Sequence, residues 1–351
     1  MYNFIITLTI GYLCGYIFFR LKVPGGMMVG SIVGVSIFNI MTGMAYIPIG
    51  AKVAAQIIAG AFIGVGLEKS DLIRLKDIFK PAFTILSGLI FLNILIGFII
   101  YYISPLDLVT SFMSAIPGGI SDIPIISEEM GADSAKVAAM QFVRLVFGIG
   151  VFPTMIKKIT DLKYFNKHVI EGTNVEAYER VTTTSNDYKD LILTLLIATI
   201  FGVLGRVLDI PSGTLVFSMV SVIVLNISTG RGYLPRAYKR LAQVLAGTYV
   251  GSGIVYSDLL EIKFILLPAI VLVTGYAITC ICVGTFICRK FNMPIKDAML
   301  ACTPAGASDM ALIASDIGVK SADVIVIQVI RMVVVVSIFP QIIRIIVSIF
   351  G

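Results

Sequence analysis

Histidine and tryptophan are almost absent from this chain of 351 residues, which has one histidine, His168, and no tryptophan. Copper and iron sites need several histidine or carboxylate ligands, so a metal-dependent membrane oxidase is disfavoured. The five cysteines lie in or beside apolar runs, and Cys280 and Cys282 have poor spacing for zinc. Walker A and dinucleotide-binding motifs are also missing. We therefore expect no disulfide framework, no metal, no cofactor and no enzymatic activity.

Charged residues are also scarce, at 14%, whereas 58% of the residues are hydrophobic and the mean hydropathy is +0.98. A soluble protein cannot bury so much apolar surface, but a bilayer can act as its solvent. Continuous apolar runs at 192–207, 264–287 and 324–340 support this interpretation. The net charge of +6 then reflects Lys and Arg in cytoplasmic loops, and we expect no nucleic-acid partner.

The most informative feature is an internal duplication, in which one half matches the other at a fixed offset of 187 residues. The matches need no gap between Pro24 and Pro153, a length over which chance cannot keep the register. They include Gly60, Gly64 and Gly66 with Gly247, Gly251 and Gly253, and Pro117, Gly119, Ser121 and Asp122 with Pro304, Gly306, Ser308 and Asp309.

Each half contains six apolar pieces, and the fifth decides the topology. If all six spanned the membrane, the halves would be parallel. If the fifth piece dips in and returns, each half has five spans and the halves are inverted. With the N-terminus outside, the inverted arrangement places 19 of the 27 basic residues inside, as the positive-inside rule requires. In the first half the pieces are 3–20, 25–43, 48–67, 80–103, 107–128 and 135–156.

We therefore predict an all-α polytopic membrane protein with two inverted-topology repeats. Each repeat has about five transmembrane helices and a broken or re-entrant Gly-rich hairpin. The first transmembrane repeat is residues 1–156, the second is residues 191–351, and residues 157–190 form a polar cytoplasmic linker. The linker holds His168, which we expect to be a solvated loop residue rather than a ligand or base.

The fifth piece of each half contains helix breakers between apolar stretches, at 115–122 and 302–309. Irregular backbone at membrane depth is tolerated only inside protein or against a water-filled cavity. Two matched breaks predict a substrate site near the midplane, where free N–H groups at the start of a half-helix can hold an anion. The substrate-binding residues expected there are Pro117, Gly118, Gly119, Ser121, Pro304, Ala305, Gly306 and Ser308.

A Ser-Asp pair follows each break, and its carboxylate has two interpretations. Asp122 and Asp309 could cap the half-helix, because Ser and Asp side chains accept bonds from free N–H groups. A carboxylate inside a membrane is also costly and often functional. We therefore expect Asp122 and Asp309 to couple an ion or a proton, a role that is compatible with capping.

The last span of each half carries a glutamine and, one turn later, an arginine. An arginine there costs roughly 2.5–3.5 kcal/mol on insertion scales, so it needs a partner. One interpretation is binding of an anionic substrate, because Arg holds a carboxylate bidentately. The other is a structural ion pair with Asp122, Asp309, Glu129 or Asp316. The residues assigned to the substrate site on this basis are Gln141, Arg144, Gln328 and Arg331.

Three further features have structural interpretations. The Gly60-x3-Gly64 and Gly247-x3-Gly251 pairs favour close helix packing. Gln56 and Gln243, one turn before these pairs, could line a cavity or bond between helices. Glu128 and Glu129 precede Gly131 in an expected surface turn, where they would be solvated.

The paired P-[GA]-G-x-S-D segments are each followed by a glycine, Gly131 or Gly318, and then by Q-x-x-R. Together these motifs resemble the bacterial AbrB-type membrane protein family with its duplicated domain, over nearly the whole chain apart from the linker. The second segment has Ala305 where the first has Gly118, so the two tips are not chemically equivalent. Family members carry the labels ammonia monooxygenase and regulator of gene expression. The family is similar to cation–proton antiporter and anion transporter folds, which use inverted repeats.

The resemblance implies a secondary active transporter, although fold analogy alone does not fix a function. We predict transport of a small anionic metabolite, coupled to sodium or protons, across the bacterial inner (cytoplasmic) membrane. The expected partners are the substrate, the lipid bilayer and a second copy in a homodimer. The alternatives are a membrane sensor that regulates gene expression indirectly and a channel, because twin re-entrant loops also occur in channels.

Overall fold

The computed structural model describes residues 2–23, 25–120, 122–160, 188–208, 210, 212–304 and 322–350, and every element in them is a helix. Five helices are long and apolar enough to cross a membrane, and α3 with α4, bent by 62°, would make a sixth. The described residues thus form only helices, about five of which could span a membrane, whereas the sequence predicted about five in each half. The five spans are Tyr2–Arg20, Phe79–Ile103, Tyr188–Val207, Lys263–Phe291 and Asp323–Phe350.

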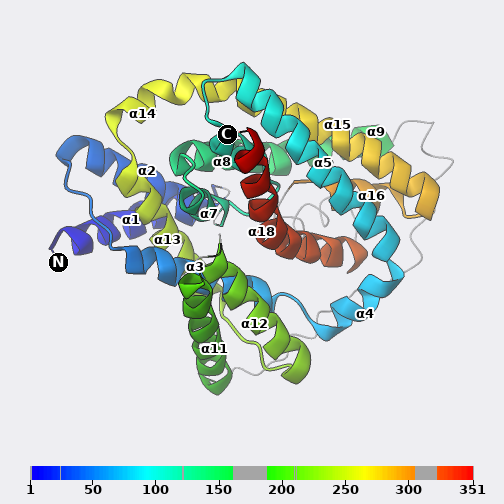
Figure 1. Cartoon of the computed structure of the whole chain (residues 1–351), viewed down its shortest axis with the longest axis horizontal. Coiled ribbons are helices and arrows are strands. Elements are labelled where there is room, and N and C mark those ends of the chain that lie inside the picture. Colours follow the sequence, from blue (N-terminus) through cyan, green and yellow to red (C-terminus); the bar gives the residue numbers. More distant parts are fainter. Residues whose placement is uncertain are drawn as a thin grey trace.

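The helices form two bundles, and each half of the chain contributes to both (Figure 1). The scaffold bundle combines the first three helices of each half, which pack mainly on one another. In Figure 1 it occupies the left and lower parts of the molecule. Its helices are α1 (Tyr2–Arg20), α2 (Gly26–Thr42), α3 (Ile49–Val65), α11 (Tyr188–Val207), α12 (Gly213–Thr229) and α13 (Arg236–Gly253).

The hairpin bundle combines the later helices of each half, with the long α5 and α15 packed together at the upper right of Figure 1. Short helices join the two bundles: α4 (Lys69–Asp77) in the first half, and α14 (Tyr256–Glu261) with the 3-10 turn η1 (Ile262–Ile265) in the second. The hairpin bundle consists of α5 (Phe79–Ile103), α6 (Leu108–Ala115), α7 (Ile123–Glu129), α8 (Ser134–Gly150), α9 (Phe152–Thr160), α15 (Leu266–Phe291), α16 (Ile295–Cys302) and α18 (Ala322–Phe350).

Close glycine contacts hold the scaffold bundle together. A Cβ added at Gly60 would lie 2.5 Å from the Leu215 carbonyl oxygen of α12, and one at Gly247 would lie 2.6 Å from the Met28 oxygen of α2. Leu215 is the residue 187 positions after Met28. The predicted packing role of the glycine pairs is confirmed, because only a residue without a side chain lets the backbones approach this closely.

Contacts between the two halves are reciprocal. The amide of Asn39 in α2 donates to the carbonyls that end α13, at Ser252 and Ile254 (3.0 and 3.1 Å). The amide of Asn226 in α12 donates to the matching carbonyls at the end of α3, Val65 and Leu67 (3.1 and 2.9 Å). Reciprocal contacts of this kind are those of a two-fold relation between similar units.

Helices α3 and α13, which match one another in the duplication, run antiparallel. Lys52, near the start of α3, lies 5.4 Å from the centre of the Tyr249 ring near the end of α13. Lys239, near the start of α13, lies 5.0 Å from the Phe62 ring near the end of α3. Large apolar side chains point outward from α11, among them Ile192, and suit a lipid environment.

Two sequence expectations need refinement. Residues 69–77, expected as a charged loop, form α4, which begins with a capping box between Glu68 and Asp71. The last piece of the first half is two helices, α8 and α9, meeting at Val151. Of the predicted linker, 157–160 belong to α9 and 188–190 to α11, and His168 lies outside the described residues.

Candidate functional site

The fifth segment of the first half, hairpin 1 (residues 107–133), folds back on itself. The carboxylate of Asp107 accepts a hydrogen bond from the N–H of Thr110 at 2.9 Å and so caps α6. The Thr110 hydroxyl in turn accepts a bond from the N–H of Asp133 at 2.9 Å. The beginning and the end of the segment are therefore joined, as in a re-entrant hairpin and unlike a helix that crosses and continues.

The tip of hairpin 1 is an irregular turn packed against α18 of the other half. Helix α6 ends at Ala115, and a turn that begins at Ile116 leads to α7, with the N–H of Ile123 bonded to the Gly119 carbonyl at 3.1 Å. A Cβ at Gly119 would lie 3.1 Å from the Met332 side chain. Glycine therefore permits the close approach between the tip and α18. The predicted tip residues Pro117 and Gly118 lie in this turn, and Ser121 lies outside the described residues.

The end of α6 leaves carbonyl groups that the helix itself cannot satisfy. Gln141 of α8 donates to one of them, Ile116, at 3.1 Å, and Arg144 donates to the carbonyls of Ile116 and Gly118. Both side chains are buried, with exposed fractions of 0% and 2%. Gln141 and Arg144, which were expected at the substrate site, thus stabilise the backbone of the hairpin tip by hydrogen bonds. We call this arrangement bracing.

This geometry differs from the ion pair considered for Arg144. Among the described residues, no carboxylate lies within ion-pair distance of its guanidinium group; Asp309 and Asp316 are outside them. The positive charge instead lies at the carbonyl end of a helix, where it is favoured by the helix dipole. The Nε of Arg144 is buried and has no hydrogen-bond partner in the described part of the chain.

Two residues from neighbouring helices, neither of them predicted from the sequence, also donate to carbonyls of α6. The Tyr276 hydroxyl of α15 donates to the Ala115 carbonyl at 2.8 Å. The Asn93 amide of α5 donates to the Phe112 carbonyl at 3.4 Å. Their only sequence signal is a polar group in an apolar span, where a buried donor needs an acceptor.

The second half repeats this bracing as far as it is described. Gln328 donates to the Leu300 carbonyl at 3.0 Å, and Arg331 donates to the Thr303 carbonyl at 2.6 Å. The Cys280 thiol, which matches Asn93, points to the Met299 carbonyl at 3.2 Å. Pro304 is buried just beyond α16. The remaining predicted residues of this tip, Ala305, Gly306, Ser308 and Asp309, lie outside the described residues.

Asp122 occupies the N-cap position of α7, yet its carboxylate makes no capping hydrogen bond. It is buried, with an exposed fraction of 6%, and no described residue donates a side-chain bond or an ion pair to it. One carboxylate oxygen lies against Gly119 of the tip. A buried carboxylate without a described partner costs free energy, which distinguishes Asp122 from the capping residues Asp107 and Asp133.

The base of hairpin 1 is bonded to the scaffold bundle. Lys52 forms an ion pair with Glu128, and the Tyr249 hydroxyl donates to the same carboxylate at 3.1 Å. Gln56 donates to Glu129 at 2.8 Å. Glu128 is therefore not simply solvated, as was expected, whereas Glu129 is exposed but also hydrogen-bonded. The signal that could have found these contacts is the pair Lys52 and Gln56 on one helix face, which recurs 187 residues later.

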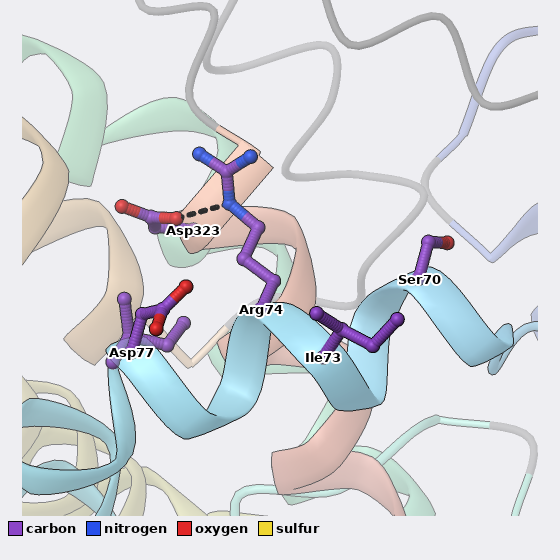
Figure 2. Close-up of a pocket in the computed structure, with 6 residues that line it drawn as sticks. Ser70, Ile73, Arg74, Asp77 and Asp323 are labelled. Atoms are coloured by element: carbon purple, nitrogen blue, oxygen red, sulfur yellow. Dashed lines mark hydrogen bonds and ion pairs between the residues drawn. The ribbon is translucent and has the colours of Figure 1, made fainter.

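A cavity of about 540 Å³ lies apart from the tip, between α4 and the start of α18. Figure 2 shows Arg74 of α4 reaching toward Asp323, with which it forms an ion pair. Sequence reasoning placed Arg74 in an inside loop and predicted no cavity there. The cavity is lined by Ser70, Ile73, Arg74, Asp77, Ile78 and Asp323.

Known proteins resemble the chain over most of its length. A family model described as "Transition state regulatory protein AbrB" matches residues 27–347. "Uncharacterized protein YhjN" of Bacillus subtilis (strain 168) is 26% identical over 309 residues, which cover 84% of this chain and 78% of that protein. "Putative regulator AbrB" of Escherichia coli (strain K12) is 26% identical over 322 residues, covering 90% of this chain and 88% of that protein.

Proposed function

The chain belongs to the AbrB family, and we propose that it is a secondary active transporter of a small anionic metabolite, coupled to sodium or protons. The observation that carries this proposal is hairpin 1, which places a broken backbone and the buried carboxylate of Asp122 at one point. Irregular backbone and an ionisable group at membrane depth mark substrate and ion pathways.

We propose that the two halves have inverted topology in the bacterial inner membrane. Matching helices of inverted repeats run antiparallel to one another, and α3 and α13 do so. The basic residues support the same orientation, because most of them then face the cytoplasm. The repeats proposed are residues 1–156 and 191–351, joined by the cytoplasmic linker 157–190.

Alternating access would arise from movement of the hairpin bundle against the scaffold bundle. Short connecting helices, α4 and α14, are the covalent links between the bundles within each half. Transporters with repeats commonly move one bundle as a rigid body around a central site. A homodimer would then be formed through outward-facing helices, with lipid covering the remaining apolar surface.

One hydrogen-bond donor of Arg144 is not used by the carbonyls of the hairpin tip, and this supports an anionic substrate. The guanidinium of Arg144 uses its two terminal nitrogens on the carbonyls of the hairpin, while its buried Nε has no hydrogen-bond partner among the described residues. A buried donor without an acceptor favours a ligand that carries one. Asp122 is the proposed coupling group, with Asp309 as its counterpart, and the proposal involves no catalysis and no other cofactor.

The proposal is tested by ligand binding followed by uptake. Purified protein would be melted in detergent with sodium, a pH series and a panel of carboxylates and other small anions, since a ligand of the folded state raises its melting temperature. The same ligands would be tested for uptake into proteoliposomes. Asp122→Asn should abolish coupled uptake, whereas Asp77→Asn, which changes an exposed carboxylate, should leave it unchanged.

One outcome would contradict the coupling role of Asp122, and two others would contradict transport itself. Full coupled uptake by Asp122→Asn would remove the coupling role. Unitary currents in bilayers, with no ion gradient needed, would favour a channel. A transcriptional response that is lost when residues 157–190 are deleted, in protein that transports nothing, would favour a sensor, in line with the regulator name of the E. coli relative.

A further inference from the structure

A short non-helical segment separates the scaffold bundle from the connecting helix in each half. It is residues 66–68 between α3 and α4, which are bent by 62°, and residues 254–255 between α13 and α14. The peptide group between Leu67 and Glu68 in the first segment matches that between Ile254 and Val255 in the second, 187 positions later. Both halves therefore pass from one bundle to the other at the same point of the duplication.

The peptide group between Leu67 and Glu68 is hydrogen-bonded on both of its edges. Its carbonyl oxygen accepts a bond from the Asn226 amide of α12, in the scaffold bundle, at 2.9 Å. Its N–H donates to the Asp71 carboxylate of the connecting helix α4, also at 2.9 Å. One peptide group is thus bonded to the scaffold bundle by its carbonyl and to α4 by its N–H.

The matching peptide group between Ile254 and Val255 repeats both bonds. Its carbonyl accepts from the Asn39 amide of α2 at 3.1 Å, and its N–H donates to the Asp258 carboxylate of α14 at 2.9 Å. The C=O and N–H bonds of a planar trans peptide point in opposite directions, so the two hydrogen bonds of each group lie near one line. Because rotation about that line breaks neither bond, each peptide group can act as a swivel.

The connecting helices themselves are attached to the hairpin bundle. Arg74 of α4 forms an ion pair with Asp323 of α18, and Glu261 of α14 forms one with Lys136 of α8. Each pair joins the connecting helix of one half to the hairpin bundle helix of the other half. Apolar residues of the connecting segments also belong to the core of the hairpin bundle or pack against it, namely Leu75, Ile78 and Ile265.

We propose that the peptide groups Leu67–Glu68 and Ile254–Val255 are two pivots, on which the hairpin bundle turns against the scaffold bundle and carries α4 and α14 with it. The scaffold side of each pivot ends at a carbonyl that an asparagine holds. The moving side begins at an N–H that an aspartate holds. The pivots rest on the bundle movement proposed above for transport, but they can be tested without a substrate.

The test measures distances between spin labels on purified protein, in which Cys14→Ala and Cys282→Ala leave only buried thiols. A label pair on the same side of a pivot should give one narrow distance. A pair across a pivot should give two distances, or a distribution about twice as wide. The same-side pairs are Lys76→Cys with Ile338→Cys and Lys263→Cys with Val151→Cys, and the across pairs are Lys76→Cys with Leu196→Cys and Lys263→Cys with Thr9→Cys, all at exposed positions.

Asparagine variants test the two pivots separately. Asn226→Ala should widen the distances of the across pair in the first half only, and Asn39→Ala those in the second half only, because each frees one pivot carbonyl. Asn93→Ala is the matched control, since it removes an asparagine bond to a helix carbonyl within the hairpin bundle and should widen neither. Melting temperatures identify any variant that fails to fold.

Narrow distances in the across pairs, or wide distances in the same-side pairs, would overturn the pivots. Equal widening by Asn226→Ala and Asn93→Ala would overturn them as well. Wide across-pair distances in protein without uptake would support the pivots and contradict transport. Uptake by protein whose across pairs stay narrow would contradict the pivots alone.

Discussion

The two halves of the molecule repeat some contacts residue for residue and others only in kind. Gln141 and Gln328, like Arg144 and Arg331, donate to carbonyls at matching positions of α6 and α16. The partner of Phe112, by contrast, is an asparagine amide, while that of the matching Met299 is a cysteine thiol. The carbonyls that the helix breaks leave free therefore accept from the same residue types, glutamine and arginine, in both halves.

An ion pair shows the opposite behaviour. Lys136 of α8 pairs with Glu261 of α14, and at the matching positions Asp323 of α18 pairs with Arg74 of α4. The two pairs are equivalent by the 187-residue offset, but their signs are reversed. An ion pair between side chains needs only opposite charges, whereas a carbonyl oxygen always needs a donor. The residues that donate to carbonyls are therefore of the same type in both halves, whereas the two residues of an ion pair can exchange their charges.

The largest effect is expected for Arg144→Met. The variant loses charged donors to two buried carbonyls, each worth about 1.5–3 kcal/mol, so we expect the free energy of unfolding to fall by about 3 kcal/mol or more. Arg144→Lys should not restore it, because a point charge cannot replace the planar fork. The melting temperature of detergent-purified protein measures this, with Arg331→Met as the matched variant.

That comparison also separates the two interpretations of the arginine. Protein with Arg144→Met that melts like wild type but no longer binds the ligand would show that the side chain serves the substrate and that its bracing role is minor.

Next in size are substitutions of the packing glycines. Gly60→Leu and Gly247→Leu each force a side chain against a backbone carbonyl of the other half, and overpacking of this kind costs about 1–3 kcal/mol. Because the two sites are equivalent, their losses in melting temperature should be similar. Gly50→Leu, at a glycine with open space around it, is the control. A large difference between Gly60→Leu and Gly247→Leu would break the two-fold relation.

A smaller effect is expected for the asparagines that cap helices of the opposite half. Asn39→Ala and Asn226→Ala each remove two hydrogen bonds to carbonyls, at about 0.5–1.5 kcal/mol per bond. We expect equal shifts in melting temperature, additive in the double variant because the sites are far apart. Strong non-additivity would show that the two caps are coupled.

The smallest effect is expected for the reversed ion pairs. Lys136→Glu and Asp323→Arg each place like charges together, and each should be corrected by reversing its partner, Glu261 or Arg74. Partly exposed pairs contribute about 1 kcal/mol or less. Double-variant cycles on the melting temperature measure the pairs. An uncorrected loss at one site would show that the sign of that pair has a further role.

The helices and the helix break at the hairpin tip could be predicted from the sequence, but the side-chain contacts at the candidate site could not. Continuous apolar runs predicted membrane-length helices, and paired glycines predicted the close packing at Gly60 and Gly247, because both follow from local composition. The role of Arg144 could not be predicted, since its partners are backbone carbonyls that every residue carries. A sequence can suggest a carboxylate partner for an arginine, but it does not mark which carbonyls a helix break leaves exposed.

The contacts of Glu128 and the hydrogen bond of Tyr276 were missed for a related reason. Tyr276, Glu128 and Tyr249 each look ordinary in sequence, at the end of a turn or within an apolar span. Their contacts join residues more than 120 positions apart, so nothing local records them. The matching offset could have pointed to Lys52, because the lysine recurs at Lys239.

The reciprocal asparagine caps have a consequence for how the chain is made. When α3 emerges during synthesis, the carbonyls at its end have no donor until Asn226 follows, 161 residues after Val65. Asn39 likewise waits for acceptors that lie 213 and 215 residues further on. The first half therefore enters the bilayer with exposed polar groups and completes its own helices only when the second half has been inserted beside it.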